Sequence, residues 1–442
     1  MARDFRGDRV LMFRTSLIDA DTLTPRARAL AFPILPPALL ETEEKLAPVA
    51  VERWPFDPEQ LMAKASEKTG LSDFGPDYFR TALDRLCASA ESDLNLSAIG
   101  RRNLHAQILD HLIQRLRFEQ LWKSHPAILD EPVEQPIIIV GLPRSGTTFL
   151  QQLLSLDPVM RSAPFWESLS PLPDHDPAIR PPDDAPLVER ARRNVEGLAI
   201  NAPALLALHQ LDPMVAEEDI YLLGPGFATM LHEWVYILPS YAEWFAKTDQ
   251  TPGYLHFRKV IQTLQWLRGG REQRWLLKCP QHMEQLDPLL TAFPDATIVE
   301  TLRDPATACV SVTNLTVYGQ RLRTNTPDPV GTGAAFTLII TRLVDAYVRD
   351  RPEQDRRFVP VHFAELMQEP MAAVEAIYAA ANLELTPKVR ALMEAHITAN
   401  SSKKGHGGSD YAAQDFGIDV EALRGRLAPY YARFCVSYDQ RL

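Results

Sequence analysis

The chain has 442 residues, of which 46% are hydrophobic and 23% charged, and its formal net charge at pH 7 is -11. This length and apolar content allow two or three domains, or one α/β domain with large helical additions. The acidic balance argues against a nucleic-acid-binding protein, which would carry a basic surplus.

The cysteines indicate which kinds of site to expect, because no two of them form a Cys-x-x-Cys pair. Their spacing disfavours a zinc site and a disulfide framework, and it favours a reducing compartment. The N-terminal residues precede no long apolar run, and no window approaches the roughly 18 apolar residues that span a bilayer. We therefore expect a cytoplasmic protein without a membrane span.

The first part of the chain divides into two regions. Residues 1–55 are dotted with prolines, so we predict an irregular extension. Residues 56–130 are predicted to form a helical N-terminal region, because Asp57-Pro58 is a typical helix start and leucines recur at helical spacing from Leu109. Such a region offers helical surface at which two subunits could pair, so a homo-oligomer is compatible with the sequence.

Residues 131–442 alternate between strand and helix patterns after Ile137. This alternation predicts an α/β fold with a P-loop-like parallel sheet flanked by helices. One long aromatic stretch, 187–270, shows helical patterning only, and we predict that it is an insertion that roofs the ends of the strands. The expected strands lie at 137–141, 275–278, 296–302 and 358–363, and the stretch 160–186 is predicted to be a loop.

The turn after the first strand is the most informative segment. Gly141 and Gly146 have the Gly-x4-Gly spacing of a phosphate-binding P-loop, and a hydroxyl residue, Thr148, follows. Thr147 stands where a nucleotide triphosphatase has its lysine, and the cation comes earlier, at Arg144. The loop can still bind a phosphate through backbone N–H groups at a helix N-terminus. The missing lysine favours a nucleotide with a simpler phosphate tail than ATP.

The stretch 137–157 resembles the 5′-phosphosulfate loop of sulfotransferases that use 3′-phosphoadenosine 5′-phosphosulfate (PAPS). Arg303-Asp304-Pro305, with Ser311 eight residues after the arginine, resembles the 3′-phosphate motif of the same family, about 160 residues downstream of the loop. Further segments at 69–75, 276–282 and 416–419 are similar to the bacterial branch that has an N-terminal helical extension. The resemblance covers residues 65–435 approximately.

This resemblance implies PAPS as the donor of a sulfuryl group, a hydroxyl or amine as the acceptor, and no metal ion. A metal is not needed because a sulfuryl group carries less charge than a phosphoryl group. The residues expected to bind PAPS are Arg144, Ser145, Gly146, Thr147, Thr148, Arg303, Ser311, and, in a basic Gly-rich loop, Lys403 and Lys404. Lys278, at the end of a strand expected beside the loop strand, could stabilise the leaving oxygen.

A base must take the proton of the acceptor. Glu167 is our first candidate, because several sulfotransferase branches have a glutamate there and Phe165 and Trp166 could raise its pKa. His209 is the second candidate, although the nearby segment 212–214 has Asp-Pro-Met where this branch more often has His-Pro-Met. The acidic run 217–219 is interpreted mainly as favouring a helix N-terminus, with a role at a metal or an amine acceptor as the alternative.

Two other functions remain open from the sequence. One is a P-loop kinase or nucleotide triphosphatase, which would depend on magnesium. The other is a non-catalytic relative that binds the nucleotide. The acceptor is not identified by the sequence, and a small molecule such as a steroid, lipid, sugar or phenol, or a peptide, would be compatible with an aromatic helical roof.

Overall fold

The computed structural model describes residues 23–33, 35–175, 180–401 and 411–439 of the chain. Its centre is a five-stranded sheet in which every pairing is parallel and the strand order is β2-β3-β1-β4-β5. The strands are β1 (Ile137–Gly141), β2 (Met160–Arg161), β3 (Arg274–Lys278), β4 (Thr297–Leu302) and β5 (Phe358–His362). The predicted parallel α/β sheet is therefore confirmed, and the two-residue strand β2 lies in the stretch predicted to be a loop.

Successive side chains of β1 pack against two different helical layers, as the period of a strand requires. Ile137 and Ile139 belong to an apolar cluster with helices on one face of the sheet. Ile138 and Val140 belong to the larger cluster on the other face. The helices of the first cluster are α7 (Thr147–Leu154), α17 (Phe363–Gln368), α18 (Pro370–Ala380) and α19 (Pro387–Ser401).

The second face is covered by helices that join the sheet to the N-terminal region in one core. They are α13 (Thr251–Arg268), α14 (Leu286–Ala292), α15 (Pro305–Gln320) and α16 (Pro329–Asp350), with the short η5 (Pro280–Met283) after β3. The C-terminal elements η6 (Ala413–Phe416), α20 (Val420–Arg426) and α21 (Ala428–Phe434) pack beside α15 and α16.

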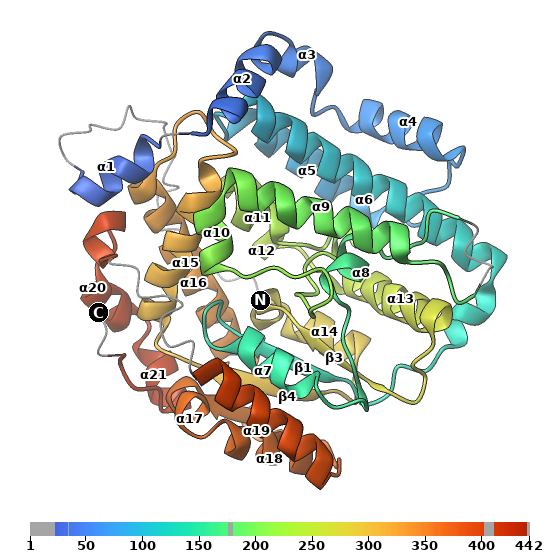
Figure 1. The fold of residues 1–442 in the computed structure, drawn as a ribbon, viewed down its shortest axis with the longest axis vertical. Helices are drawn as coiled ribbons and strands as arrows, with labels where there is room; N and C mark the ends of the chain where they lie inside the picture. The colour runs from blue at the N-terminus through green and yellow to red at the C-terminus, as the bar shows by residue number, and fades with distance from the viewer. Residues whose placement is uncertain (1–22, 34, 176–179, 402–410, 440–442) are drawn as a thin grey trace, which may run out of the picture.

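The N-terminal helical region is present, and in Figure 1 its helices run in blue along the end of the molecule opposite α18 and α19. Asp57 caps α4 through the amide of Gln60, as the Asp-Pro pattern predicts. The elements of this region are α4 (Pro58–Thr69), α5 (Tyr78–Ser92), α6 (Ala98–Ser124) and η3 (Pro126–Asp130).

The prediction of an irregular extension is wrong for the described residues before Phe56. They form α1 (Pro25–Ala31), α2 (Pro37–Leu46), η2 (Ala47–Val49) and α3 (Ala50–Arg53). Pro25 and Pro37 stand at the first helical position, where proline starts a helix because its missing N–H is not needed there.

The insertion between β2 and β3 is helical at its two ends only. Residues 209–230 are mainly turns, and Ala216 forms an isolated bridge with Pro164. Proline and glycine at 213 and 224–226 interrupt the helical pattern there. The helices of this part of the chain are α8 (Phe165–Leu169), α9 (Ala185–Asn201), α10 (Pro203–Leu208), α11 (Leu231–Tyr236) and α12 (Pro239–Ala246), with η4 (Gly224–Gly226).

Within the described ranges, no helix combines the length and the apolarity that crossing a bilayer requires.

Candidate functional site

The turn from β1 into α7 has the backbone of a phosphate-binding loop. Gly146 has a φ of 87° and precedes the first residue of α7. The first bond of the α-helical type joins the Leu150 amide to the Gly146 carbonyl at 3.0 Å, so the amides of Thr147 and Thr148 have no intrahelical acceptor. These amides, at the positive end of a helix, are suited to an anion.

The close approach of β4 explains the first glycine of the motif. A Cβ atom at Gly141 would lie 1.9 Å from Oγ1 of Thr301. The same threonine hydroxyl lies 2.6 Å from Oγ of Ser145, which also donates to the Leu142 carbonyl at 2.6 Å. The Ser145 side chain is fully buried. Its hydroxyl therefore stabilises the loop from inside, and only its backbone remains for the predicted donor contact.

Arg144, Ser311 and Arg303 meet at this loop although the two motifs are far apart in the sequence. The Nε atom of Arg144 donates to Oγ of Ser311 at 3.2 Å, and Arg303 donates to the carbonyl oxygen of Arg144. Arg303 also lies 3.3 Å from Oδ2 of Asp439. The predicted 5′ and 3′ motifs thus form one cationic cluster.

The guanidinium of Arg144 donates to a backbone carbonyl, that of Leu208 at the end of α10, at 3.1 Å. In the part of the chain that the structure describes, no carboxylate forms an ion pair with Arg144. Burial lowers the pKa of Arg144, and the nearby Tyr411 opposes this effect. A half-buried guanidinium without a carboxylate is a suitable partner for a phosphate or sulfate oxygen.

Asp304 fixes the 3′ motif to the C-terminal helices. Its carboxylate caps α15 through the Ala306 amide at 3.0 Å and accepts hydrogen bonds from Arg424 at 2.7 Å and Tyr431 at 2.6 Å. Burial would raise the pKa of Asp304, but the hydrogen bonds from Arg424 and Tyr431 lower it overall. The position of Arg303 therefore depends on α20 and α21.

Lys278 lies beside the loop strand, as predicted, because β3 pairs with β1 with Lys278 opposite Ile139. Its fully buried ammonium is 3.0 Å from Glu218 and 3.4 Å from the hydroxyl of Thr148. Burial alone would lower the pKa of Lys278, but the charges of Glu218 and Glu217 raise it overall. The structure thus brings a charged lysine to the first turn of α7.

A chain of buried polar groups holds the end of β3. The backbone N–H of Lys278 donates to Oδ2 of Asp219 at 2.6 Å, and Nε2 of His282 lies 3.4 Å from the same oxygen. Nδ1 of His282 is 2.9 Å from the hydroxyl of Tyr254. Burial raises the pKa of Asp219, while His282 opposes that shift. His282 is therefore placed to position Lys278 through Asp219.

His209 follows α10 and faces the acidic run. Its Nε2 atom lies 3.6 Å from Oε2 of Glu217, and its side chain is 31% exposed, whereas that of Glu217 is 8% exposed. Burial would raise the pKa of Glu217, but the hydrogen bond from His209 and the charge of Lys278 lower it to about 2. Glu217 is therefore a carboxylate at neutral pH.

Glu167, unlike His209, is buried between two arginines. Its Oε1 atom lies 3.1 Å from both Arg161 and Arg268, and its side chain is 3% exposed. Burial raises the pKa of Glu167, and the two arginines oppose this shift. Both guanidinium groups bind the same carboxylate oxygen of Glu167, whereas His209 contacts Glu217, which interacts with Lys278.

The acidic run was the main feature that sequence reasoning misjudged. Glu217 and Glu218 lie in an irregular segment and Asp219 in a turn, and none of them starts an α-helix, so the helix-dipole interpretation is wrong. Instead, their carboxylates pair with two histidines and a lysine of the site. The described residues contain no group of three histidine, cysteine or acidic side chains that could hold a metal ion. Lys403 and Lys404 lie outside the described residues.

The comparisons with known proteins agree with these features. A model described as the sulfotransferase family matches residues 136–387. Sulfotransferase STF1 from Mycobacterium tuberculosis H37Rv is 29% identical, with a TM-score of 0.72, over 84% of this chain and 98% of its own. Sulfotransferase STF9 from Mycobacterium avium is 27% identical, with a TM-score of 0.75, over 87% of this chain and 98% of its own. No curated protein matches the chain significantly.

Proposed function

The chain belongs to the sulfotransferase family, and on this premise we propose that it transfers a sulfuryl group from PAPS to a hydroxyl or amine acceptor. The observation that carries the proposal is the cluster of Arg144, Ser311 and Arg303 at the N-terminus of α7. An anionic donor with phosphate groups at two positions matches a cluster that has cations at two positions.

The hydrogen-bond donors of this cluster suit the charged groups of PAPS. Free amides at the start of α7 and the guanidinium of Arg144 suit the 5′-phosphosulfate, and Arg303 with Ser311 suits the 3′-phosphate. PAPS supplies an activated sulfuryl group whose bond to the bridging oxygen breaks as the acceptor oxygen or nitrogen bonds to sulfur. The electron pair of the broken bond stays on the bridging oxygen of the departing 3′-phosphoadenosine 5′-phosphate.

We assign the base role to His209 and reverse the order of the two candidates. With Glu217 on the Nε2 side, the proton is favoured at Nε2 and the Nδ1 lone pair can accept the proton of the acceptor. Glu217 acts as a positioning residue in this arrangement. Lys278, which contacts Thr148 and is kept charged by Glu218, can stabilise the negative charge that develops on the departing oxygen.

The proposal is tested by titration calorimetry of the purified protein with 3′-phosphoadenosine 5′-phosphate in the presence of a chelator, and with ATP and magnesium. We expect saturable binding of the first and none of the second. Transfer of radiolabelled sulfur from PAPS to acceptors in the same chelator then tests catalysis. Binding of ATP with magnesium, without binding of 3′-phosphoadenosine 5′-phosphate, would replace this function with that of a kinase or nucleotide triphosphatase.

A further inference from the structure

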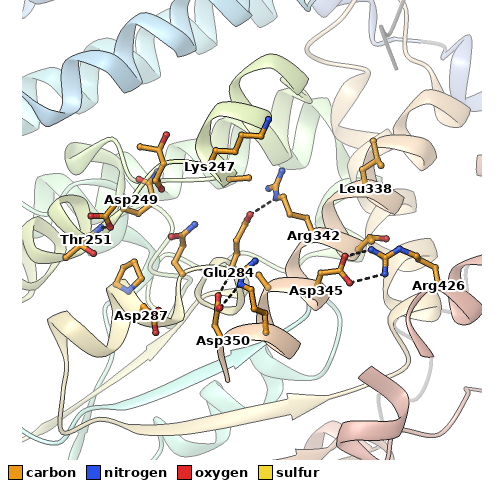
Figure 2. A pocket seen from close by; sticks show the side chains of 18 residues that line it. Lys247, Asp249, Thr251, Glu284, Asp287, Leu338, Arg342, Asp345, Asp350 and Arg426 are labelled. Atoms are coloured by element: carbon orange, nitrogen blue, oxygen red, sulfur yellow. Dashed lines mark hydrogen bonds and ion pairs between the residues drawn. The ribbon is translucent and has the colours of Figure 1, made fainter. Parts of the chain in front are cut away.

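Arg342 shows how this protein compensates a partly buried arginine (Figure 2). It lies beside a cavity of about 700 Å³ between α12, α13 and α16. Its guanidinium is 2.8 Å from Glu284 and 2.9 Å from Glu233. Burial would lower the pKa of Arg342, but the two carboxylates raise it overall. The charge of this arginine is satisfied within the protein, so it offers little to a ligand.

Arg323, which follows the end of α15, is partly buried without such a carboxylate. It forms no ion pair with any residue that the structure describes, and its Cζ atom lies 5.7 Å from the ring centroid of Tyr236. Burial lowers the pKa of Arg323, and only the hydroxyls of Tyr236 and Tyr221 oppose this shift. A partly buried cation without a carboxylate is costly for the fold, and it is suited to an anion from outside.

The end of α15 is shaped to hold this side chain. A Cβ atom at Gly319 would lie 2.1 Å from Nη1 of Arg323, so only a glycine lets the guanidinium fold back over the last turn of the helix. The backbone is held on both sides, because the Arg323 amide donates to the Gln320 carbonyl at 2.9 Å and its carbonyl accepts the Ser97 amide at 3.0 Å. The position of the guanidinium is therefore built into the packing.

Tyr221 links Arg323 to the proposed base. Burial raises the pKa of Tyr221, the charges of Glu217 and Glu218 raise it further, and the charge of Arg323 opposes them. Tyr221 is thus close enough to feel both the acidic run and the arginine. Glu217 is in turn the partner of His209. Arg323 therefore lies on the acceptor side of the candidate site.

The helices α15 and α10 indicate what kind of molecule can extend from His209 towards Arg323. Ser311 at the donor cluster and Gly319 under the guanidinium are both on α15, and their separation along its axis is about 12 Å at 1.5 Å per residue. The helix α10, which His209 follows, contacts α15 and consists of proline, alanine and leucine only, yet none of its residues is buried. An apolar spacer would cover this partly exposed surface.

On the premise of the proposed function, we propose that the acceptor is a small hydroxy acid, whose hydroxyl group reaches His209 and whose carboxylate binds Arg323. Its apolar middle packs against α10. The carboxylate supplies the negative charge that the protein withholds from Arg323, whereas a neutral alcohol would leave the guanidinium uncompensated. Arg323 is in this way a specificity-determining residue, and it takes no part in the proton transfer.

The test compares 3-(4-hydroxyphenyl)propanoate with 3-(4-hydroxyphenyl)propanamide, which has the same shape and no charge. Each is titrated calorimetrically into the full chain saturated with 3′-phosphoadenosine 5′-phosphate, so that Arg144 and Arg303 are occupied and cannot attract the carboxylate. We expect the acid to bind about 10-fold more tightly than the amide, as for other charge-assisted hydrogen bonds. Transfer of radiolabelled sulfur from PAPS should show the same preference in KM, with equal kcat.

Arg323→Met should raise the Kd of the acid about 10-fold and leave that of the amide unchanged, whereas Arg323→Lys should keep part of the preference. Thermal unfolding tests for a structural role. Because Arg323 has no carboxylate to leave behind, Arg323→Met should keep the unfolding midpoint or raise it. The matched control is Arg321→Met, which removes the same charge two residues away, from an arginine that donates to the Ala29 carbonyl at 3.3 Å.

The inference is overturned if the wild type binds the acid no better than the amide, or binds neither. A lower unfolding midpoint of Arg323→Met with an unchanged preference would make Arg323 a structural residue. An equal loss of preference in Arg321→Met would mean general attraction of anions to this end of α15. Failure of 3′-phosphoadenosine 5′-phosphate to bind in the preceding titration would instead overturn the proposed function, and this inference with it, so the two failures are distinguishable.

Discussion

The two sides of the candidate site differ in how their charges are paired. On the donor side, Arg144 contacts Ser311 and a backbone carbonyl, with no carboxylate in the described residues. On the opposite side, the acidic run 217–219 pairs with His209, Lys278 and His282. A cation that pairs with no carboxylate is suited to an anionic ligand, whereas a carboxylate paired with a histidine or lysine favours the protonated form of its partner. In the proposed function the first side binds the donor and the second transfers the proton, so substitutions on each side should have separate effects.

The largest effect is expected from His209→Ala. Removing the proposed base should lower kcat by about 10²- to 10⁴-fold, with the affinity for 3′-phosphoadenosine 5′-phosphate unchanged, because His209 acts on the acceptor. Steady-state transfer kinetics and calorimetry on the same protein give the two values. His125→Ala, on a half-buried ring that packs against Trp266, is the control. A kcat that stays near the wild-type value in His209→Ala would remove the histidine from the mechanism.

Glu167→Gln should lower the free energy of unfolding more than it lowers the rate of sulfuryl transfer. The substitution leaves Arg161 and Arg268 buried with less compensation, which we expect to cost about 3 kcal/mol of unfolding free energy. Urea unfolding measures this loss, and the exposed pair of Glu59 with Arg80 supplies the control, since Glu59→Gln should cost under about 0.5 kcal/mol. If Glu167→Gln keeps its stability and loses transfer activity, the glutamate is the base after all.

Arg144→Ala tests the donor side. Loss of a charge-assisted donor to the 5′-phosphosulfate should weaken binding of 3′-phosphoadenosine 5′-phosphate by about 100-fold. The backbone of residue 144 has a φ of 66°, but alanine retains the Cβ atom, so the backbone strain is the same in both proteins. Calorimetry gives the affinity, and Arg271→Ala, which removes an exposed arginine, is the control. Unchanged affinity in Arg144→Ala would mean that Arg144 does not bind the nucleotide.

The sequence was sufficient to predict the sheet and the position of the loop residues for a local reason. The apolar run at β1 is continuous, β3 and β4 contain shorter apolar runs, and the glycines and Arg144 lie within one turn. The predicted neighbourhood of Lys278 is confirmed, because β3 pairs with β1 in parallel and places Lys278 next to the loop strand. By contrast, β2 has only two residues, too few for a period to be recognised.

The opposite side of the site could not be predicted because its contacts join distant segments. Lys278 and Glu218 are 60 residues apart, and within the phosphate loop the buried contact of Ser145 with Thr301, 156 residues apart, was hidden for the same reason. No local pattern indicates which member of an acidic run faces a histidine, or that a loop hydroxyl turns inward. The aromatic residues beside Glu167 suggested desolvation correctly, but Arg161 and Arg268, which pair with it, lie in other elements.

Glu217→Gln should have the smallest effect, and that effect should depend on pH. The folded-state pKa of Glu217 is about 2, against 4.5 for an unperturbed glutamate, so the carboxylate adds stability above pH 4.5. As the pH falls from 4.5 towards 2, the unfolded state binds the proton first and this contribution is lost. We expect the wild type to lose about 1 kcal/mol more than Glu217→Gln between pH 6 and pH 3.5, measured by urea unfolding. Equal acid sensitivity of the two proteins would mean that His209 and Lys278 do not hold this carboxylate in its charged form, and the proposed orientation of His209 would lose its physical basis.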